Sequence, residues 1–117
     1  MSKNLEIARL FSLGKFDQVA NYLSENITFH VYEEDMHLTG KQDVLKFCNE
    51  IATYFASVET NFTESGYLVS DNEVAIYGSA EFKRNGEVVS QVNSCDIYRF
   101  DTSEMITEIR SFCNSKR

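Results

Sequence analysis

The sequence predicts an α+β fold with the element order helix, helix, strand, helix and four strands, in which a curved mixed or antiparallel sheet wraps three N-terminal helices. Two observations predict it. As far as Ala56, most apolar residues recur three or four positions apart, which is the spacing of one helix face. Beyond Ala56 this period stops, and turn signals at residues 70–73, 85–86 and 101–104 divide the remainder into four strands.

The first two helices are predicted from their apolar stripes. Ser2 can cap a first helix, and Gly14 suits the left-handed position that ends it. A second helix is expected from Lys15. The stripe of the first helix consists of Ile7, Ala8, Leu10 and Phe11, and that of the second consists of Phe16, Val19, Ala20 and Leu23.

A strand and a third helix follow. Ile27, Phe29 and Val31 alternate with polar residues, so this trio should face the core and His30 should face outward. An acidic loop at residues 33–35 comes next. Thr39 and Gln42 have the spacing of a capping box, which predicts the start of the third helix. This helix has the strongest amphipathic pattern in the chain, with the apolar face Val44, Phe47, Cys48, Ile51, Ala52 and Phe55.

The sharpest turn signal is Asn85-Gly86, because both central residues of a type I′ hairpin turn need positive φ. In the strand before it, Ile76, Gly78, Ala80 and Phe82 share a face, and the small residues at positions 78 and 80 should leave room above the sheet. In the last strand, alternation leaves open whether the row of Ile106 or the row of Ile109 faces inward.

One carboxylate, Asp96, stands in the middle of an otherwise mostly apolar strand face formed by Val92, Ser94, Asp96, Tyr98 and Phe100. If this row points inward, desolvation raises the pKa of Asp96 unless a donor or a cation compensates, and such carboxylates are typical of ligand sites. The alternative is a structural carboxylate, paired with an arginine such as Arg99 or Arg110 or hydrogen-bonded to a tyrosine.

Length and composition limit the function further. The 117 residues predict a single domain, residues 1–117, and 43% hydrophobic residues suffice for a packed core. The net charge of -7 argues against nucleic-acid or anionic-membrane partners. The first residues lack an apolar signal core, and the apolar runs are too short to span a bilayer, so we expect a soluble, cytoplasmic protein.

The cysteines and histidines predict neither a disulfide framework nor a metal site. Cys48, Cys95 and Cys113 are odd in number and widely spaced, so they are expected to be buried free thiols. His30 and His37 do not have a metal-ligand spacing. We therefore expect no metal and no organic cofactor.

The element order, together with the motifs LGKFD at residues 13–17, LTG at 38–40, DIYRF at 96–100 and ITEIR at 106–110, resembles the SnoaL-like branch of the NTF2-like superfamily. The resemblance covers almost the whole chain. It implies a cone-shaped, cystatin-like α+β barrel with an internal pocket, commonly paired as a homodimer through the sheet face. It implies little about chemistry, because the superfamily contains isomerases, cyclases, hydrolases and non-catalytic binders.

The ketosteroid isomerases, distant relatives in this superfamily, allow a comparison by position. Asp96 falls where they place a pocket carboxylic acid, but their catalytic base falls at Val31 and their oxyanion tyrosine at Ile7. Because valine cannot accept a proton, isomerisation by that mechanism is not expected. The comparison, with the Asp96 row, predicts a pocket lined by Phe29, Val31, Phe47, Ala80, Phe82, Ser94, Asp96, Tyr98 and Ile109.

Three functions fit these observations. The first is binding of a small apolar or weakly polar molecule, with Asp96 as its main polar contact. The second is a cofactor-independent isomerase, cyclase or hydrolase in which Asp96 is the general acid or base, helped by Tyr98, Ser94 or His37, with His37 at the pocket mouth. The third is a non-catalytic, dimeric interaction protein whose sheet face carries Tyr77, Lys83, Asn93 and Arg99.

Overall fold

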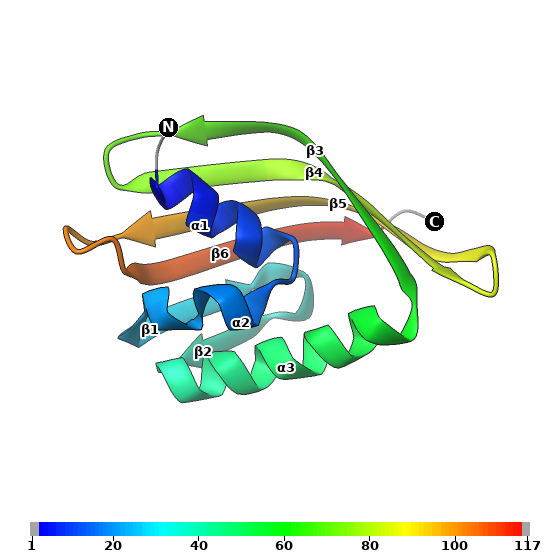
Figure 1. Cartoon of the computed structure of the whole chain (residues 1–117), viewed down its shortest axis with the longest axis horizontal. Helices are drawn as coiled ribbons and strands as arrows, with labels where there is room; N and C mark the ends of the chain where they lie inside the picture. Colours follow the sequence, from blue (N-terminus) through cyan, green and yellow to red (C-terminus); the bar gives the residue numbers. More distant parts are fainter. Residues whose placement is uncertain (1–2, 116–117) are drawn as a thin grey trace.

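The computed structural model describes residues 3–115, which form three α-helices and one mixed sheet of six strands (Figure 1). The helices are α1 (Lys3–Ser12), α2 (Phe16–Val19) and α3 (Lys41–Ser57). The strands are β1 (Leu23–Val31), β2 (Met36–Thr39), β3 (Glu59–Val69), β4 (Glu73–Arg84), β5 (Glu87–Phe100) and β6 (Ile106–Ser115). The predicted α+β class is therefore confirmed.

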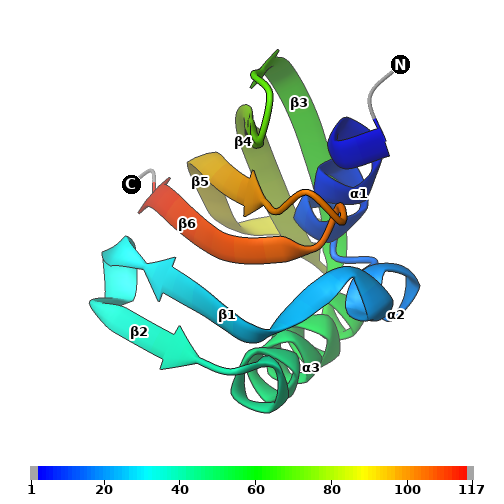
Figure 2. The ribbon, with the colours of Figure 1, turned by 90° about the vertical axis from the view of Figure 1, so that its left-hand side faces the viewer.

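The strands are arranged in the order β2-β1-β6-β5-β4-β3, and all neighbours are antiparallel except β1 and β6. The sheet is open, with β2 and β3 at its edges. It curves around the helices, all of which lie on its concave face (Figure 2). None of the helices described is long and apolar enough to cross a membrane.

The first helix agrees with its predicted stripe. Ile7, Ala8 and Phe11 are buried, and Gly14 has a φ of +82° at the end of the helical segment. The predicted cap, Ser2, lies outside the described residues. The core next to α1 contains a group of aromatic rings in which Phe11 makes edge contacts with Phe16 and Tyr98, at centroid distances of 5.0 and 5.7 Å.

The second helix is shorter than predicted. It ends at Val19, a 3-10 turn follows (Ala20–Tyr22), and Leu23 begins β1. Leu23 is buried and pairs with Ile106 of the parallel strand β6. The prediction was wrong at this end because a side chain that the helical period would bury is buried equally well by strand pairing.

The predicted acidic loop is a 3-10 turn (Tyr32–Glu34) followed by Asp35 in the left-handed region, with a φ of +50°. This reversal leads into β2, an edge strand that pairs with β1 and that the prediction missed. A strand of four residues is too short to show a clear alternation. The order is therefore helix, helix, strand, strand, helix and four strands.

The third helix starts where it was expected, but not by the predicted cap. Gly40 is the N-cap residue, with a φ of +97°, and no side chain caps the helix. Thr39 is still part of β2, where it pairs with Thr28, so it cannot form the capping box with Gln42. Val44 and Cys48 are buried on the inner face of α3, as the apolar stripe predicted.

Two further predictions concern the turn between β4 and β5 and the inward-facing residues of β6. Asn85 and Gly86 both have positive φ, 55° and 81°, as the predicted hairpin requires. In β6 a register shift pairs Phe100 with Ile106 but Arg99 with Glu108. This bulge turns both Ile106 and Ile109 toward the core. Simple alternation could therefore not decide which of the two rows faces inward.

Candidate ligand-binding cavity

A cavity of about 500 Å³ lies between α3 and the concave face of the sheet. Phe29 lines this cavity and connects it to the core. Its ring centroid lies 5.9 Å from that of Phe11 in the core and 5.8 Å from that of Phe47 on α3. Seven of the residues proposed from the sequence line its wall: Phe29, Val31, Phe47, Ala80, Phe82, Ser94 and Asp96. Exposed residues such as Glu34 and Tyr54 also belong to the wall, so the cavity is open to solvent.

Three proposed residues of the sheet do not reach the cavity. Tyr98 and Ile109 are almost completely buried behind the wall, at 0% and 1% exposure. Gly78 packs against β3, where a side chain would clash with the carbonyl of Thr63, so only Ala80 leaves room above the sheet.

Hydroxyl groups from two other elements hold the Asp96 carboxylate. Ser111 of β6 donates a hydrogen bond to Oδ1 at 2.7 Å, and Ser12 at the end of α1 donates to Oδ2 at 2.9 Å. The phenol oxygen of Tyr98 lies 2.6 Å from Ser12 Oγ. Because Ser12 gives its one hydroxyl hydrogen to Asp96, Tyr98 donates to Ser12. The chain Tyr98, Ser12, Asp96 therefore joins α1 to β5.

Burial raises the pKa of Asp96, because a carboxylate surrounded by protein loses much of its solvation. Hydrogen bonds from Ser111, Ser12 and Tyr98 act in the opposite direction and offset part of this effect. Burial also raises the pKa of Tyr98 well above its usual value, and the neighbouring carboxylate adds to the rise. Asp96 is thus held by neutral donors.

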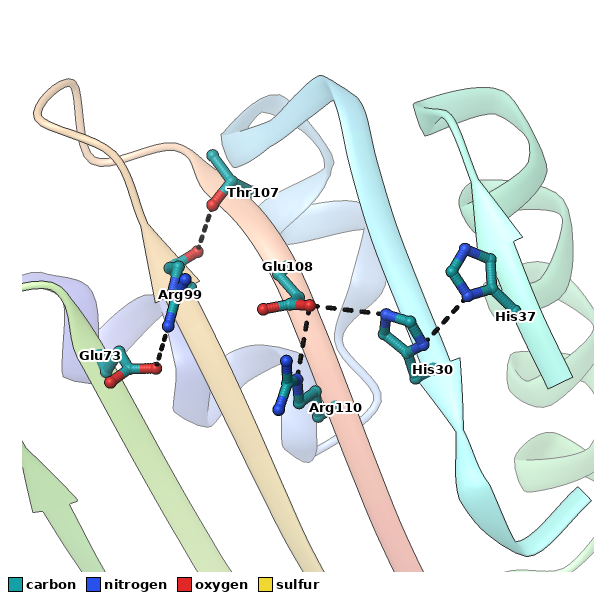
Figure 3. Close-up of polar contacts among 7 residues, drawn as sticks. All are labelled: His30, His37, Glu73, Arg99, Thr107, Glu108 and Arg110. Atoms are coloured by element: carbon teal, nitrogen blue, oxygen red, sulfur yellow. Dashed lines mark hydrogen bonds and ion pairs between the residues drawn. The ribbon is translucent and has the colours of Figure 1, made fainter. Parts of the chain in front are cut away.

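The two arginines considered as partners of Asp96 lie on the opposite, convex face of the sheet (Figure 3). Arg99 binds Glu73 at 3.2 Å, and Arg110 lies 3.4 Å from Glu108. The alternative of an Asp96–arginine pair is therefore wrong. The other structural alternative, a tyrosine partner, has support: Tyr98 hydrogen-bonds Ser12, and its interaction with Asp96 lowers the pKa of that carboxyl.

Comparison with protein families shows to which family the chain belongs. Residues 6–109 match the family described as the SnoaL-like domain. The chain belongs to this family. The sequence-based resemblance is therefore confirmed over most of the chain. Comparison with functionally curated proteins finds no match.

Solved structures similar to this SnoaL-like domain have the NTF2-like fold. An NTF2-like protein of unknown function from Cytophaga hutchinsonii has a TM-score of 0.82 and 28% identity, covering 93% of this chain and 94% of that one. A protein proposed to be a SnoaL-like polyketide cyclase, from Shewanella putrefaciens, has a TM-score of 0.77 at 13% identity, covering 97% and 81%. One proposed to be a ketosteroid isomerase, from Kribbella flavida, has a TM-score of 0.72 at 14% identity, covering 97% and 79%. At these low identities the last two similarities show the fold alone.

In this SnoaL-like domain His37 lies on β2, on the convex face, and does not line the cavity (Figure 3). Its Nδ1 is 3.1 Å from Nδ1 of His30, and His30 Nε2 is 3.5 Å from Glu108. His30 faces outward as predicted, whereas the position expected for His37 at the pocket mouth is not observed. Among residues 3–115 no group of three or more histidine, cysteine or acidic side chains is arranged to hold a metal ion.

Sequence reasoning missed several residues of the wall. Ser12 gave no signal, because a serine at a helix end is common, and Ser111 lay in a strand whose inner row was undecided. Glu33 and Glu34 line the cavity, although we expected them in a solvated loop. Ile51, Phe55 and Val92 lie on faces that were predicted to point inward, but they were not assigned to the pocket. The other wall residues outside the predicted pocket are Glu50, Tyr54, Phe62 and Cys113.

The cysteines are free thiols. Cys48 is buried as expected, and burial raises its pKa to about 12. Cys95 and Cys113 are only half-buried. Cys113 reaches the cavity wall, but burial and its contact with Glu33 raise its pKa to about 12, so it is a protonated thiol near neutral pH.

Proposed function

We propose that this SnoaL-like domain binds a small, mostly apolar molecule in the cavity, with Asp96 as the main polar contact. The observation that carries the proposal is the cavity of about 500 Å³, with one hydrogen-bonded carboxylate set among apolar side chains. Small-molecule sites commonly enclose roughly 300–1,000 Å³ and combine apolar walls with a few fixed polar groups.

Binding is better supported than catalysis. A general acid or base usually acts with a second titratable group near the substrate. The groups that hydrogen-bond Asp96 in the described wall are the hydroxyls of Ser12 and Ser111. The other titratable side chains of the described wall do not hydrogen-bond Asp96; they are Glu33, Glu34, Glu50, Tyr54 and the protonated thiol of Cys113, and the first four are exposed. Val31, at the position that corresponds to the catalytic base of the ketosteroid isomerases, lines the cavity as an apolar residue.

The test uses phenylbutanol as a neutral apolar probe and a variant that fills the cavity. Ala80→Leu adds volume at the wall, so we expect probe affinity measured by NMR titration to fall by at least about tenfold, a loss of about 1.4 kcal/mol. The matched control is Ser79→Val, because Ser79 is the neighbouring residue on β4 and faces the other side of the sheet. Equal affinity of Ala80→Leu and wild type would contradict the proposal.

We also propose that two copies of the chain pair through the convex sheet face. Tyr77 and Phe112 are each directly opposite Cys95 in neighbouring strands, so they form one row with it across the sheet. Phe112 stacks on Tyr32 at 4.6 Å between ring centroids, and all three aromatic side chains are more than 40% exposed. An exposed row of this kind, with aromatic residues on both sides of Cys95, favours an interface.

A further inference from the structure

The charges of the cavity wall have a single sign. Asp96 is a wall residue deep in the sheet, and Glu33, Glu34 and Glu50 belong to the exposed part of the wall. Among residues 3–115, no lysine, arginine or histidine belongs to the wall. An anionic ligand would therefore meet four carboxylates and no compensating cation from the described wall, which makes its binding unfavourable.

Three arginines of the described surface are paired away from the cavity. Arg9 forms a double hydrogen bond with Glu64, each contact at 2.9 Å, and its guanidinium lies over the ring of Tyr67. Arg99 and Arg110 are on the convex face with their own acidic partners (Figure 3). Asp96 thus has neutral hydroxyl donors, and no cation of residues 3–115 lies within salt-bridge distance of it.

The apolar part of the wall is largely aromatic. Phe29 and Phe47 meet edge to face, at an angle of 82°, and Phe55 stacks on Phe82 with centroids 5.7 Å apart. Tyr54 lies 5.7 Å from Phe82 at the exposed side of the wall. Aromatic faces attract cations as well as apolar groups, and this attraction is strongest where water is excluded.

We infer that the molecule bound in the cavity is an amphiphilic amine, with a protonated amino group against the Asp96 carboxylate and an apolar body against the aromatic wall. This inference rests on the proposed function and narrows it to a ligand class. The ammonium group supplies the cation that the Asp96 site lacks, and it can donate to the carboxylate oxygens beside Ser12 and Ser111. The acidic exposed part of the wall also attracts cationic molecules toward the opening.

The experiment compares three probes with the same phenylbutyl body: phenylbutylamine, phenylbutanol and phenylbutyrate. Affinities are measured by calorimetry or NMR titration at a neutral pH, where the amine is protonated and the acid is ionised. We expect the amine to bind about tenfold or more tightly than the alcohol, because a hydrogen bond between two charged groups is stronger than one from a neutral hydroxyl. The acid should bind more weakly than the alcohol.

Two variants show whether Asp96 causes the preference for the amine over the alcohol. Asp96→Asn should abolish the preference for the amine over the alcohol, whereas Asp71→Asn, which removes an exposed carboxylate outside the wall, should retain it. If Asp96→Asn does not fold, the order of the affinities of the three probes for the wild-type protein still tests the inference. Equal affinities of amine and alcohol, tightest binding of the acid, or a preference that survives Asp96→Asn would overturn the inference while leaving the proposed function intact. Binding of none of the probes would overturn both.

Discussion

Ser12, the last residue of α1, donates a hydrogen bond of 2.9 Å to Asp96 in the middle of β5. The same hydroxyl accepts from Tyr98, whose ring is completely buried. One serine thus fixes the polar group of the cavity, satisfies a buried phenol and attaches a helix to the sheet. The geometry of the cavity therefore depends on the position of α1.

Replacing this serine tests the network. In Ser12→Ala the Tyr98 phenol loses the partner seen here, and a buried unsatisfied polar group costs about 1–3 kcal/mol. We expect the free energy of unfolding, measured in urea, to fall by about that amount. Ser70→Ala, in the exposed turn before β4, is the control. An unfolding free energy equal to that of the wild type would mean that the network adds no stability.

The pKa of Asp96 predicts a pH dependence of stability. Because folding raises this pKa above its unfolded value of about 3.9, the folded state binds the proton more tightly. The contribution of Asp96 is thus fully present below that value and is lost as the pH rises through the folded pKa. The difference in unfolding free energy between wild type and Asp96→Asn should therefore decrease with rising pH and then level off.

Urea unfolding of both proteins between about pH 3.5 and 8 measures this difference. Asp71→Asn, in the exposed loop after β3, is the control for removing one carboxylate. A wild-type advantage that increases with pH would show that the folded state favours the ionised form of Asp96, contrary to our interpretation.

The turn between β4 and β5 allows the backbone conformation to be tested separately from side-chain packing. Gly86 has a φ of +81°, and a Cβ there would contact nothing within 4 Å. Gly86→Ala should therefore destabilise the fold by about 1 kcal/mol through conformational strain alone. Affinity for a cavity probe should be unchanged, because the turn is not part of the wall. Unchanged stability would show that the turn adopts another conformation.

The proposed pairing of two chains is tested at the convex face. Phe112→Ser removes an aromatic ring that is 42% exposed, and we expect it to weaken dimerisation measured by sedimentation equilibrium. Leu13→Ser is the matched control, because Leu13 is similarly exposed but lies in the turn after α1. A wild-type chain that stays monomeric at high concentration would contradict the pairing.

Much of this fold could be predicted because its determinants are local. The stripe of α3, the alternation in β1 and the Asn85-Gly86 turn each follow from spacing or backbone preference. The errors arose where tertiary pairing decided the structure. Leu23 joined a strand through its pairing with Ile106, and Thr39 remained in β2 rather than capping α3.

The candidate site was predictable in part for the same reason. A carboxylate in an apolar row marks Asp96 within one strand. Its donors, Ser12 and Ser111, come from elements 84 and 15 residues away in the sequence, so no local pattern connects them to it. Alternation along β5 already places Arg99 on the face opposite Asp96, whereas the side of Arg110 depends on how β6 pairs with β5.

The central claim is that a small molecule occupies the cavity between α3 and the sheet. The most direct measurement is the set of intermolecular NOEs from bound phenylbutylamine to isotopically labelled protein. We predict NOEs from the phenyl ring to Phe47 and Phe82, and from the carbon next to the amine to Ser111 beside Asp96. Binding that gives NOEs only to Tyr77 and Phe112 on the convex face would contradict the account.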